Sequence, residues 1–81
     1  MALHWFSPVV PVRTDRPGVR FRVSHVEGAA EQLLKWTKRG PKWTFAVRVC
    51  MAAMSDELPA QDARKAFEEA AKEEKMFLTH G

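Results

Sequence analysis

The sequence predicts a small α+β domain in which an N-terminal β-hairpin precedes three α-helices, in the order ββααα. Charged and apolar residues alternate only within the first 23 positions, as in a half-buried strand, whereas later apolar residues recur at the three-and-four spacing of a helix. A chain of 81 residues suffices for one small core and is too short for two. We expect a single domain over 1–81, with the hairpin at about 6–23 and helices at about 25–39, 41–54 and 59–75.

The hairpin is predicted from two strand-like runs and the turn between them. Val9–Val12 is rich in β-branched residues, and Val19–Val23 alternates apolar with charged side chains. Pro17 and Gly18 suit the two central positions of a type II turn. Because Pro11 cannot donate a ladder hydrogen bond, the first strand is expected to lie at an edge of the sheet. An isolated hairpin is marginally stable, so three apolar side chains of the second strand are expected to be buried against helices: Val19, Phe21 and Val23.

The first helix is predicted to begin at a capping box and to end before a proline. Ser24 and Glu27 have the spacing at which a hydroxyl and a carboxylate cap each other's backbone amides. Gly40 suits a left-handed C-terminal cap, and Pro41 prevents the helix from continuing.

The second and third helices each begin near a proline, at Pro41 and Pro59. The second helix is apolar around much of its circumference, so we expect it to be central and largely buried, with the hairpin packed on the first and second helices. The third helix carries a stripe of small residues around one aromatic ring. Residues 76–78 could form a short C-terminal strand on the exposed edge of the second strand, extend the third helix, or make an interface.

A spaced set of aromatic, small and apolar residues runs through the chain. It includes the pattern Ala63-Arg64-x-Ala66-Phe67-x-x-Ala70-Ala71, the spacing of Trp36, Gly40 and Cys50, and Val23, Ser24, Ala30, Leu33, Leu34, Arg39, Trp43, Ala46, Ala53 and Met54. This set resembles a small bacterial family catalogued as domain of unknown function 982. Members of that family often have Pro after the first of these tryptophans and Gly after the second helix, where this chain has Thr37 and Ser55. The resemblance implies a compact α+β unit and supplies no activity.

Composition and charge narrow the classes of function. Residues 1–48 carry nine Lys and Arg against three Asp and Glu, whereas residues 49–81 carry four against seven, so the N-terminal part invites an acidic partner. A single cysteine cannot close an intrachain disulfide and favours a reducing compartment, most simply the cytoplasm. We expect no signal peptide and no membrane span, because the N-terminus lacks a basic segment and no charge-free apolar run approaches about 20 residues.

No catalytic residue, metal ligand or cofactor is expected. Cys50 lies on the apolar face of the second helix, where burial disfavours the reactive thiolate. His4, His25 and His80 are scattered, and none has a second ligand at metal-binding spacing. An enzymatic role is therefore disfavoured.

Two kinds of binding surface are predicted. Cations near aromatic rings are typical of a nucleic-acid-binding surface, in which Trp36 would stack on a base. The same residues have structural alternatives: Lys38 and Arg39 could stabilise a helix C-terminus, and Trp36 could pack in the core. The residues of this set are Arg20, Arg22, Lys35, Trp36, Lys38, Arg39 and Lys42. The second surface is predicted because the chain has more large apolar side chains than one small core can bury. Its residues are Met51, Met54, Phe77 and Leu78, and the alternative is that they are buried in the core.

The sequence therefore favours a non-enzymatic protein-interaction or regulatory module. Its expected partner is another protein or a second copy of the chain in a homodimer. Nucleic acid is the alternative partner, and no membrane partner is expected.

Overall fold

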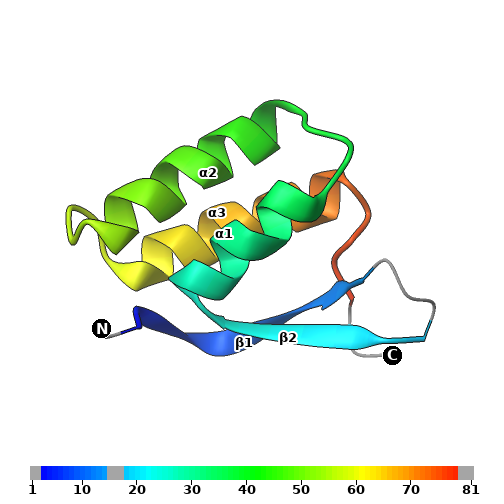
Figure 1. Ribbon diagram of the computed structural model, residues 1–81, viewed down its shortest axis with the longest axis horizontal. Coiled ribbons are helices and arrows are strands. Elements are labelled where there is room, and N and C mark those ends of the chain that lie inside the picture. Colours follow the sequence, from blue (N-terminus) through cyan, green and yellow to red (C-terminus); the bar gives the residue numbers. More distant parts are fainter. Residues whose placement is uncertain (1–2, 15–17, 79–81) are drawn as a thin grey trace.

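The computed structural model describes residues 3–14 and 18–78 and confirms the predicted α+β fold. Its elements are β1 (Trp5–Arg13), β2 (Arg20–His25), α1 (Val26–Lys35), α2 (Pro41–Met54) and α3 (Ala60–Glu73). The two strands form an antiparallel sheet, and all three helices lie on one side of it (Figure 1). The second helix has the bounds that its prolines and apolar spacing predict, while α3 is one residue shorter at its start and two at its end.

The order of the layers differs from the prediction. We expected the hairpin to pack on the first and second helices, but α3 contacts β1, α1 contacts β2, and α2 lies on the far side of both helices from the sheet (Figure 1). The alanine face of α3 explains the exchange, because small side chains let α3 approach the strands and α2 closely. Fully buried side chains from every layer make the core: Val10, Val12, Val23, Val26, Leu33, Cys50 and Phe67. The α2 helix is thus an outer layer rather than the centre of the molecule.

The start of α1 uses a different cap from the one predicted. Ser24 remains in β2, and His25 is the N-cap, with its Nδ1 accepting a hydrogen bond from the backbone N–H of Gly28 at 2.8 Å. Glycine at position 28 leaves room for this ring, since a Cβ there would lie 2.9 Å from Cε1 of His25 and the ring would have to shift. Glu27 does not reach back to Ser24 because its carboxylate binds His4 instead.

The end of α1 also differs, because the helix stops at Lys35 rather than near residue 39. Trp36 turns into an extended conformation and stacks on Phe67, with ring centroids 5.7 Å apart. The guanidinium of Arg39 then donates to the carbonyls of Leu34 and Trp36, at 3.1 Å each. Gly40 does not adopt the predicted left-handed conformation; its backbone is extended and forms the N-cap of α2.

The early end of α1 leaves the far end of the hairpin uncovered. Val23 is fully buried as predicted, but Val19 is 48% and Phe21 38% exposed, against the prediction. No helix extends over these two residues because the chain leaves α1 at Trp36. Gly18 has a φ of +82°, the sign that the predicted turn requires, while Pro17 lies outside the described residues.

The chain after α3 pairs with β1 and not with β2. Phe77 forms a single antiparallel bridge to Val12, flanked by hydrogen bonds from Arg13 N–H to the Met76 carbonyl and from Leu78 N–H to the Pro11 carbonyl. This bridge is too short to be the C-terminal strand that we considered. Among the described residues, the outer edge of β2 therefore stays without a neighbouring strand.

Side chains of α3 occupy the rest of the outer edge of β1. The Gln61 amide accepts from the Ser7 backbone N–H and donates to the Ser7 carbonyl, at 2.8 Å each. Arg64 donates to the Pro8 carbonyl at 2.8 Å. These contacts satisfy backbone groups where the register of the hairpin is irregular, between Trp5 and Val10.

Candidate functional site

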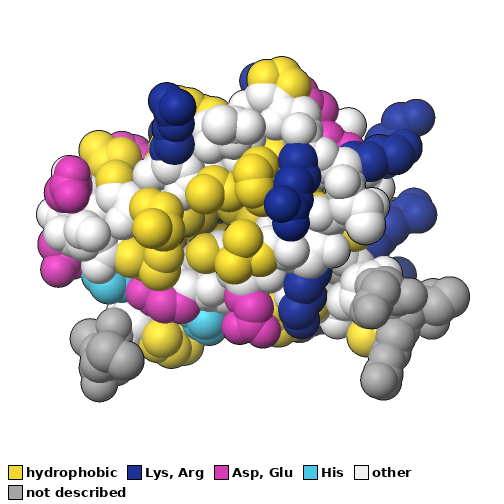
Figure 2. Space-filling view, turned by 45° about the horizontal axis from the view of Figure 1, so that its top comes forward, with side chains coloured by type: hydrophobic (Ala, Val, Ile, Leu, Met, Phe, Trp, Pro, Cys, Tyr) yellow, Lys and Arg dark blue, Asp and Glu magenta, His cyan; other side chains and the backbone are white. Residues whose placement is uncertain are grey.

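An apolar surface crosses α1 and α2 on the side away from the sheet. Figure 2 shows hydrophobic side chains gathered over these two helices. Leu34 is 64% and Met51 59% exposed, and their neighbours at helical spacing are only partly buried. We call this surface the α1/α2 face, and its residues are Ala30, Leu34, Trp43, Val47, Met51 and Met54. Exposed apolar area of this kind is typical of a contact surface.

The two ends of the α1/α2 face differ in charge. The helices run in opposite directions (Figure 1), so the start of α1 lies beside the end of α2. Glu57 lies at that end and Lys38 at the other, and neither has an ion-pair partner among the described residues. Glu27 and Lys42 also lie at these ends, but they are paired with His4 and Glu69. In Figure 2 carboxylates lie at the left-hand end and also at the upper right, and most of the Lys and Arg side chains project from the right-hand half. Each end of the face therefore carries one unpaired charge, Glu57 at one end and Lys38 at the other.

The predicted apolar interaction residues do not form one surface. Met51 and Met54 belong to the α1/α2 face, near the end of α2. Phe77 and Leu78 lie at the opposite end of the molecule, beside β1 (Figure 1). Phe77 also packs against the core, and the Lys72 ammonium lies 5.4 Å from the centroid of its ring.

A groove of about 1000 Å³ opens at the far end of the hairpin, where α1 ends early. We call it the hairpin groove. Its lining comes from both strands, the end of α1 and the segment after α3: Arg13, Thr14, Val19, Arg20, Phe21, Glu31, Gln32, Lys35, Trp36, Thr37, Lys38, Glu74 and Met76. The volume is at the upper end of what small-molecule sites occupy.

The structure divides the predicted nucleic-acid set. Arg20, Lys35 and Lys38 line the hairpin groove, together with Arg13, which the prediction left out. Arg22 pairs with Pro11 in the sheet and does not line the groove. The remaining two cations already have partners within the fold.

Those two cations are Arg39 and Lys42. Besides capping α1, Arg39 lies 4.6 Å from the centroid of the Trp43 ring. The Lys42 ammonium lies 3.7 Å from a carboxylate oxygen of Glu69 on α3. Neither residue is therefore placed with Arg20 at the groove.

Trp36 does not have the exposed ring that the stacking role requires. It is 6% exposed, and one of its faces is covered by Phe67. Its indole N–H is buried and has no acceptor among the described residues. An unsatisfied buried donor of this kind typically costs about 1–3 kcal/mol. The Trp36 side chain thus presents an unused hydrogen-bond donor rather than a stacking platform.

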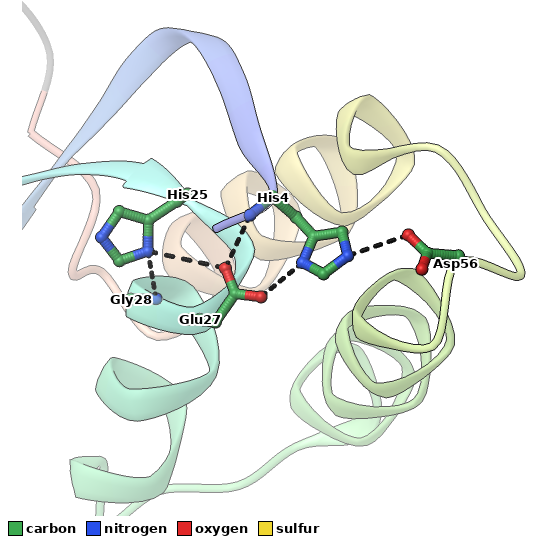
Figure 3. Close-up of polar contacts among 5 residues, drawn as sticks. All are labelled: His4, His25, Glu27, Gly28 and Asp56. Carbon is green, nitrogen blue, oxygen red and sulfur yellow. Dashed lines mark hydrogen bonds and ion pairs between the residues drawn. The ribbon is translucent and has the colours of Figure 1, made fainter. Parts of the chain in front are cut away.

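A polar cluster that the sequence did not predict joins the residue before β1, the first turn of α1 and the loop after α2. Figure 3 shows His4 between two carboxylates, with Nδ1 2.5 Å from Glu27 Oε2 and Nε2 2.9 Å from Asp56 Oδ1. The His4 backbone N–H also donates to Glu27 Oε1 at 2.9 Å. Because a neutral imidazole carries only one ring proton, this arrangement suits the doubly protonated, charged ring. Separations of 23 and 52 positions kept the cluster invisible in the sequence.

The hydrogen bond to Glu27, followed by that to Asp56, raises the pKa of His4 above 6.5. Burial opposes ionisation of Glu27, but the hydrogen bonds from His4 outweigh it and lower the pKa of the carboxyl. Asp56 is positioned for this contact by a left-handed backbone, with a φ of 60°, just after α2. The charged pair therefore ties the start of β1 to the helices.

The free energy of unfolding should fall as the pH rises through the raised pKa of His4. Since this pKa is higher in the folded than in the unfolded chain, the stabilisation is complete below about pH 6.5 and is lost above the folded value. The lowered pKa of Glu27 has the opposite sign and removes stability as the pH falls below about 4.5. Urea unfolding followed by circular dichroism from pH 4 to 9 measures the loss of stability on the acid side and on the alkaline side, the two limbs of the stability profile. His4→Gln should flatten the alkaline limb and Asp56→Asn should weaken it; an unchanged alkaline limb in His4→Gln would contradict the assignment.

The one cysteine is far from any reactive arrangement. Cys50 is fully buried in the core, and burial, followed by the charge of Glu27, raises the pKa of its thiol to about 12. No group of three or more His, Cys, Asp or Glu side chains in residues 3–14 and 18–78 is arranged to hold a metal ion. None of the helices in the described part of the chain is long and apolar enough to cross a membrane.

Comparison with known proteins agrees with the family that the sequence resembles. No curated protein and no solved structure matches the chain. The model of one protein family matches residues 9–78, which include both strands from Val9 onward, all three helices and the bridging segment after α3. The chain thus belongs to the family described as protein of unknown function (DUF982).

Proposed function

We propose that this protein is a non-enzymatic protein-interaction module that binds a second copy of itself through the α1/α2 face. The observation that carries the proposal is the outer position of α2. This helix is apolar around most of its circumference, yet α1 and α3 cover only part of it and leave Met51 exposed. Burying such side chains typically gains about 1.5–3 kcal/mol each.

The charge on the α1/α2 face favours a second copy as the occupant. A two-fold interface brings the same patch of each copy together, so its ends must complement each other when one copy is rotated. A two-fold axis through the middle of the face places the end of one copy that carries Glu57 on the end of the other copy that carries Lys38. In this arrangement Leu34 of one copy approaches Met51 of the other, and Lys38 approaches Glu57. Neither Lys38 nor Glu57 has an ion-pair partner within the described part of its own chain.

The compartment proposed for this module is the cytoplasm, which the single cysteine supports. Nucleic-acid binding stays a prediction. Of its seven residues, four line the hairpin groove, and one of those four is the buried Trp36.

Leu34→Gln combined with Met51→Gln should abolish self-association. The double variant removes four apolar side chains from a two-fold interface, which raises the dissociation constant by about 100-fold or more. Sedimentation velocity across a dilution series measures it. The matched control is Phe45→Gln, which changes a side chain of similar exposure on the side of α2 that faces α3, where Phe45 lines a hollow with Val49 and Leu58. Wild-type protein that sediments as a 9.2 kDa monomer at every concentration would refute the proposal.

A charge exchange tests the orientation of the two copies. Lys38→Glu should weaken association several-fold by placing two carboxylates together, and adding Glu57→Lys should restore it to within about twofold of wild type. The same pair of changes has no such effect if the copies meet in parallel or through another surface. Failure of the second change to restore association would therefore overturn the two-fold arrangement.

A further inference from the structure

We infer that the outer edge of β2 binds an extended acidic segment of a partner protein, which joins the hairpin as an antiparallel strand and places carboxylates beside Arg20 and Arg22. Among the described residues this edge has no neighbouring strand. The α1/α2 face lies on the side of the helices away from the sheet (Figure 1). The inference therefore does not rest on the proposed self-association.

The backbone groups that face this edge follow from the bonds on the other side of the hairpin. The Arg13 N–H and the Pro11 carbonyl both bond to the segment after α3, so they point away from β2. The register pairs Arg13 with Arg20, and Pro11 with Arg22. In such pairs the backbone groups of both members point away from each other, so those of Arg20 and Arg22 point to the open edge. The same alternation adds Ser24, and an unpaired edge of this kind is a template for another strand.

The exposed face of the sheet selects an acidic occupant. Val12 and Val23 are fully buried and point toward the helices. Side chains alternate along a strand, so the opposite face carries three arginines, Arg13, Arg20 and Arg22. All three are exposed, and none has an ion-pair partner among the described residues. Carboxylates on an added strand would form charge-assisted hydrogen bonds with guanidinium groups that otherwise repel each other.

The other face of an added strand meets apolar surface. Phe21 and Val19 line the hairpin groove and are exposed there because α1 ends before it can cover them. Residues of the added strand that lie between its carboxylates would point to this side, next to Phe21. The edge therefore fits a segment in which acidic and apolar residues alternate.

A second copy of the chain is a poorer occupant of this edge. Two β2 strands joined in opposite directions would bring Arg20 and Arg22 of both copies onto one face of the joined sheet. Like charges on neighbouring strands destabilise such a pairing. Nucleic acid would use the arginines but would leave the unpaired backbone edge without a strand. Charge and backbone together thus favour an acidic peptide.

Titration of ¹⁵N-labelled protein with a capped hexapeptide of alternating glutamate and valine tests the inference, since its length matches the six residues of β2. We expect the amide signals of Arg20, Arg22 and Ser24 to shift. Their hydrogen exchange should slow by about 10-fold at a free peptide concentration of about ten times Kd. A peptide with the same residues in two blocks, glutamates first, should bind several-fold more weakly, because its carboxylates lie on both faces of the strand.

Backbone methylation of the peptide separates strand addition from attraction between charges. In the antiparallel pairing the glutamate N–H groups donate to carbonyls of β2, whereas the valine N–H groups point away from it. N-methylation of the glutamates should therefore abolish binding, and N-methylation of the valines should leave it nearly unchanged. Equal effects of the two methylations would overturn the inference. Both peptides are used with the wild-type chain, so this result does not depend on how a variant folds.

Variants of the protein test the charge. Arg20→Gln with Arg22→Gln should weaken binding by about 2- to 30-fold, the sum expected for two cross-strand charge pairs. The matched control is Arg48→Gln, which removes an exposed charge of α2 and should leave binding unchanged. No shift of the β2 amides at millimolar peptide, or an equal loss in Arg48→Gln, would overturn the inference. Tighter binding of a single-stranded oligonucleotide, with no slowing of exchange along the edge, would also overturn it and would support nucleic acid instead.

Discussion

Phe67→Ala is expected to lower the free energy of unfolding by about 3–5 kcal/mol, the largest effect of any substitution considered. The Phe67 ring is fully buried and stacks on Trp36. Its neighbours on α3 are mostly alanines, which are too small to move into the space that the ring would vacate. Small domains are stable by only about 5–15 kcal/mol, so this substitution should remove a large share of the stability of the domain.

Urea denaturation followed by circular dichroism measures this loss. Phe45→Ala is the matched control, because it makes the same chemical change at a ring that is 60% exposed, and it should cost less than about 1 kcal/mol. Equal losses in the two variants would mean that the layer of α3 between the sheet and α2 is not the centre of the core.

Alkylation of Cys50 in the folded protein is expected to be slower than in the unfolded chain by about 1000-fold or more at neutral pH. The rise of the thiol pKa from 9.0 to about 12 lowers the thiolate fraction by about 1000-fold, and complete burial also blocks the reagent. Reaction should therefore occur through opening of the structure. Mass spectrometry after timed exposure to iodoacetamide, with and without urea, gives both rates.

The outcome for Cys50 bears on the class of function. A slow reaction that accelerates in step with unfolding agrees with a structural cysteine and with a non-enzymatic module. Rapid modification of a chain whose circular dichroism stays unchanged would contradict the burial of Cys50. It would also reopen nucleophilic chemistry for this protein.

Features that depend on neighbouring residues were predictable from the sequence. The turn near Gly18, the start of α2 at Pro41 and the alanine stripe of α3 follow from backbone preference and helical spacing, which act over a few positions. The family resemblance adds the α+β fold, which the structure confirms. The local rules failed at both ends of α1. The sequence predicted Ser24 as the N-cap and Gly40 as the C-terminal cap, but tertiary contacts placed these caps at His25 and Trp36.

The candidate sites depended on features that only the tertiary structure determines. Helical spacing shows that α2 is apolar on most sides, but not which sides α1 and α3 cover. The hairpin groove exists because packing of Trp36 on Phe67 ends α1 early, a contact between residues 31 positions apart. His4 gains its partners in the same way, since Glu27 and Asp56 are distant in the sequence. The amino-acid pattern thus determined the elements and their apolar faces, whereas close packing between distant residues determined which faces are exposed and which charges meet.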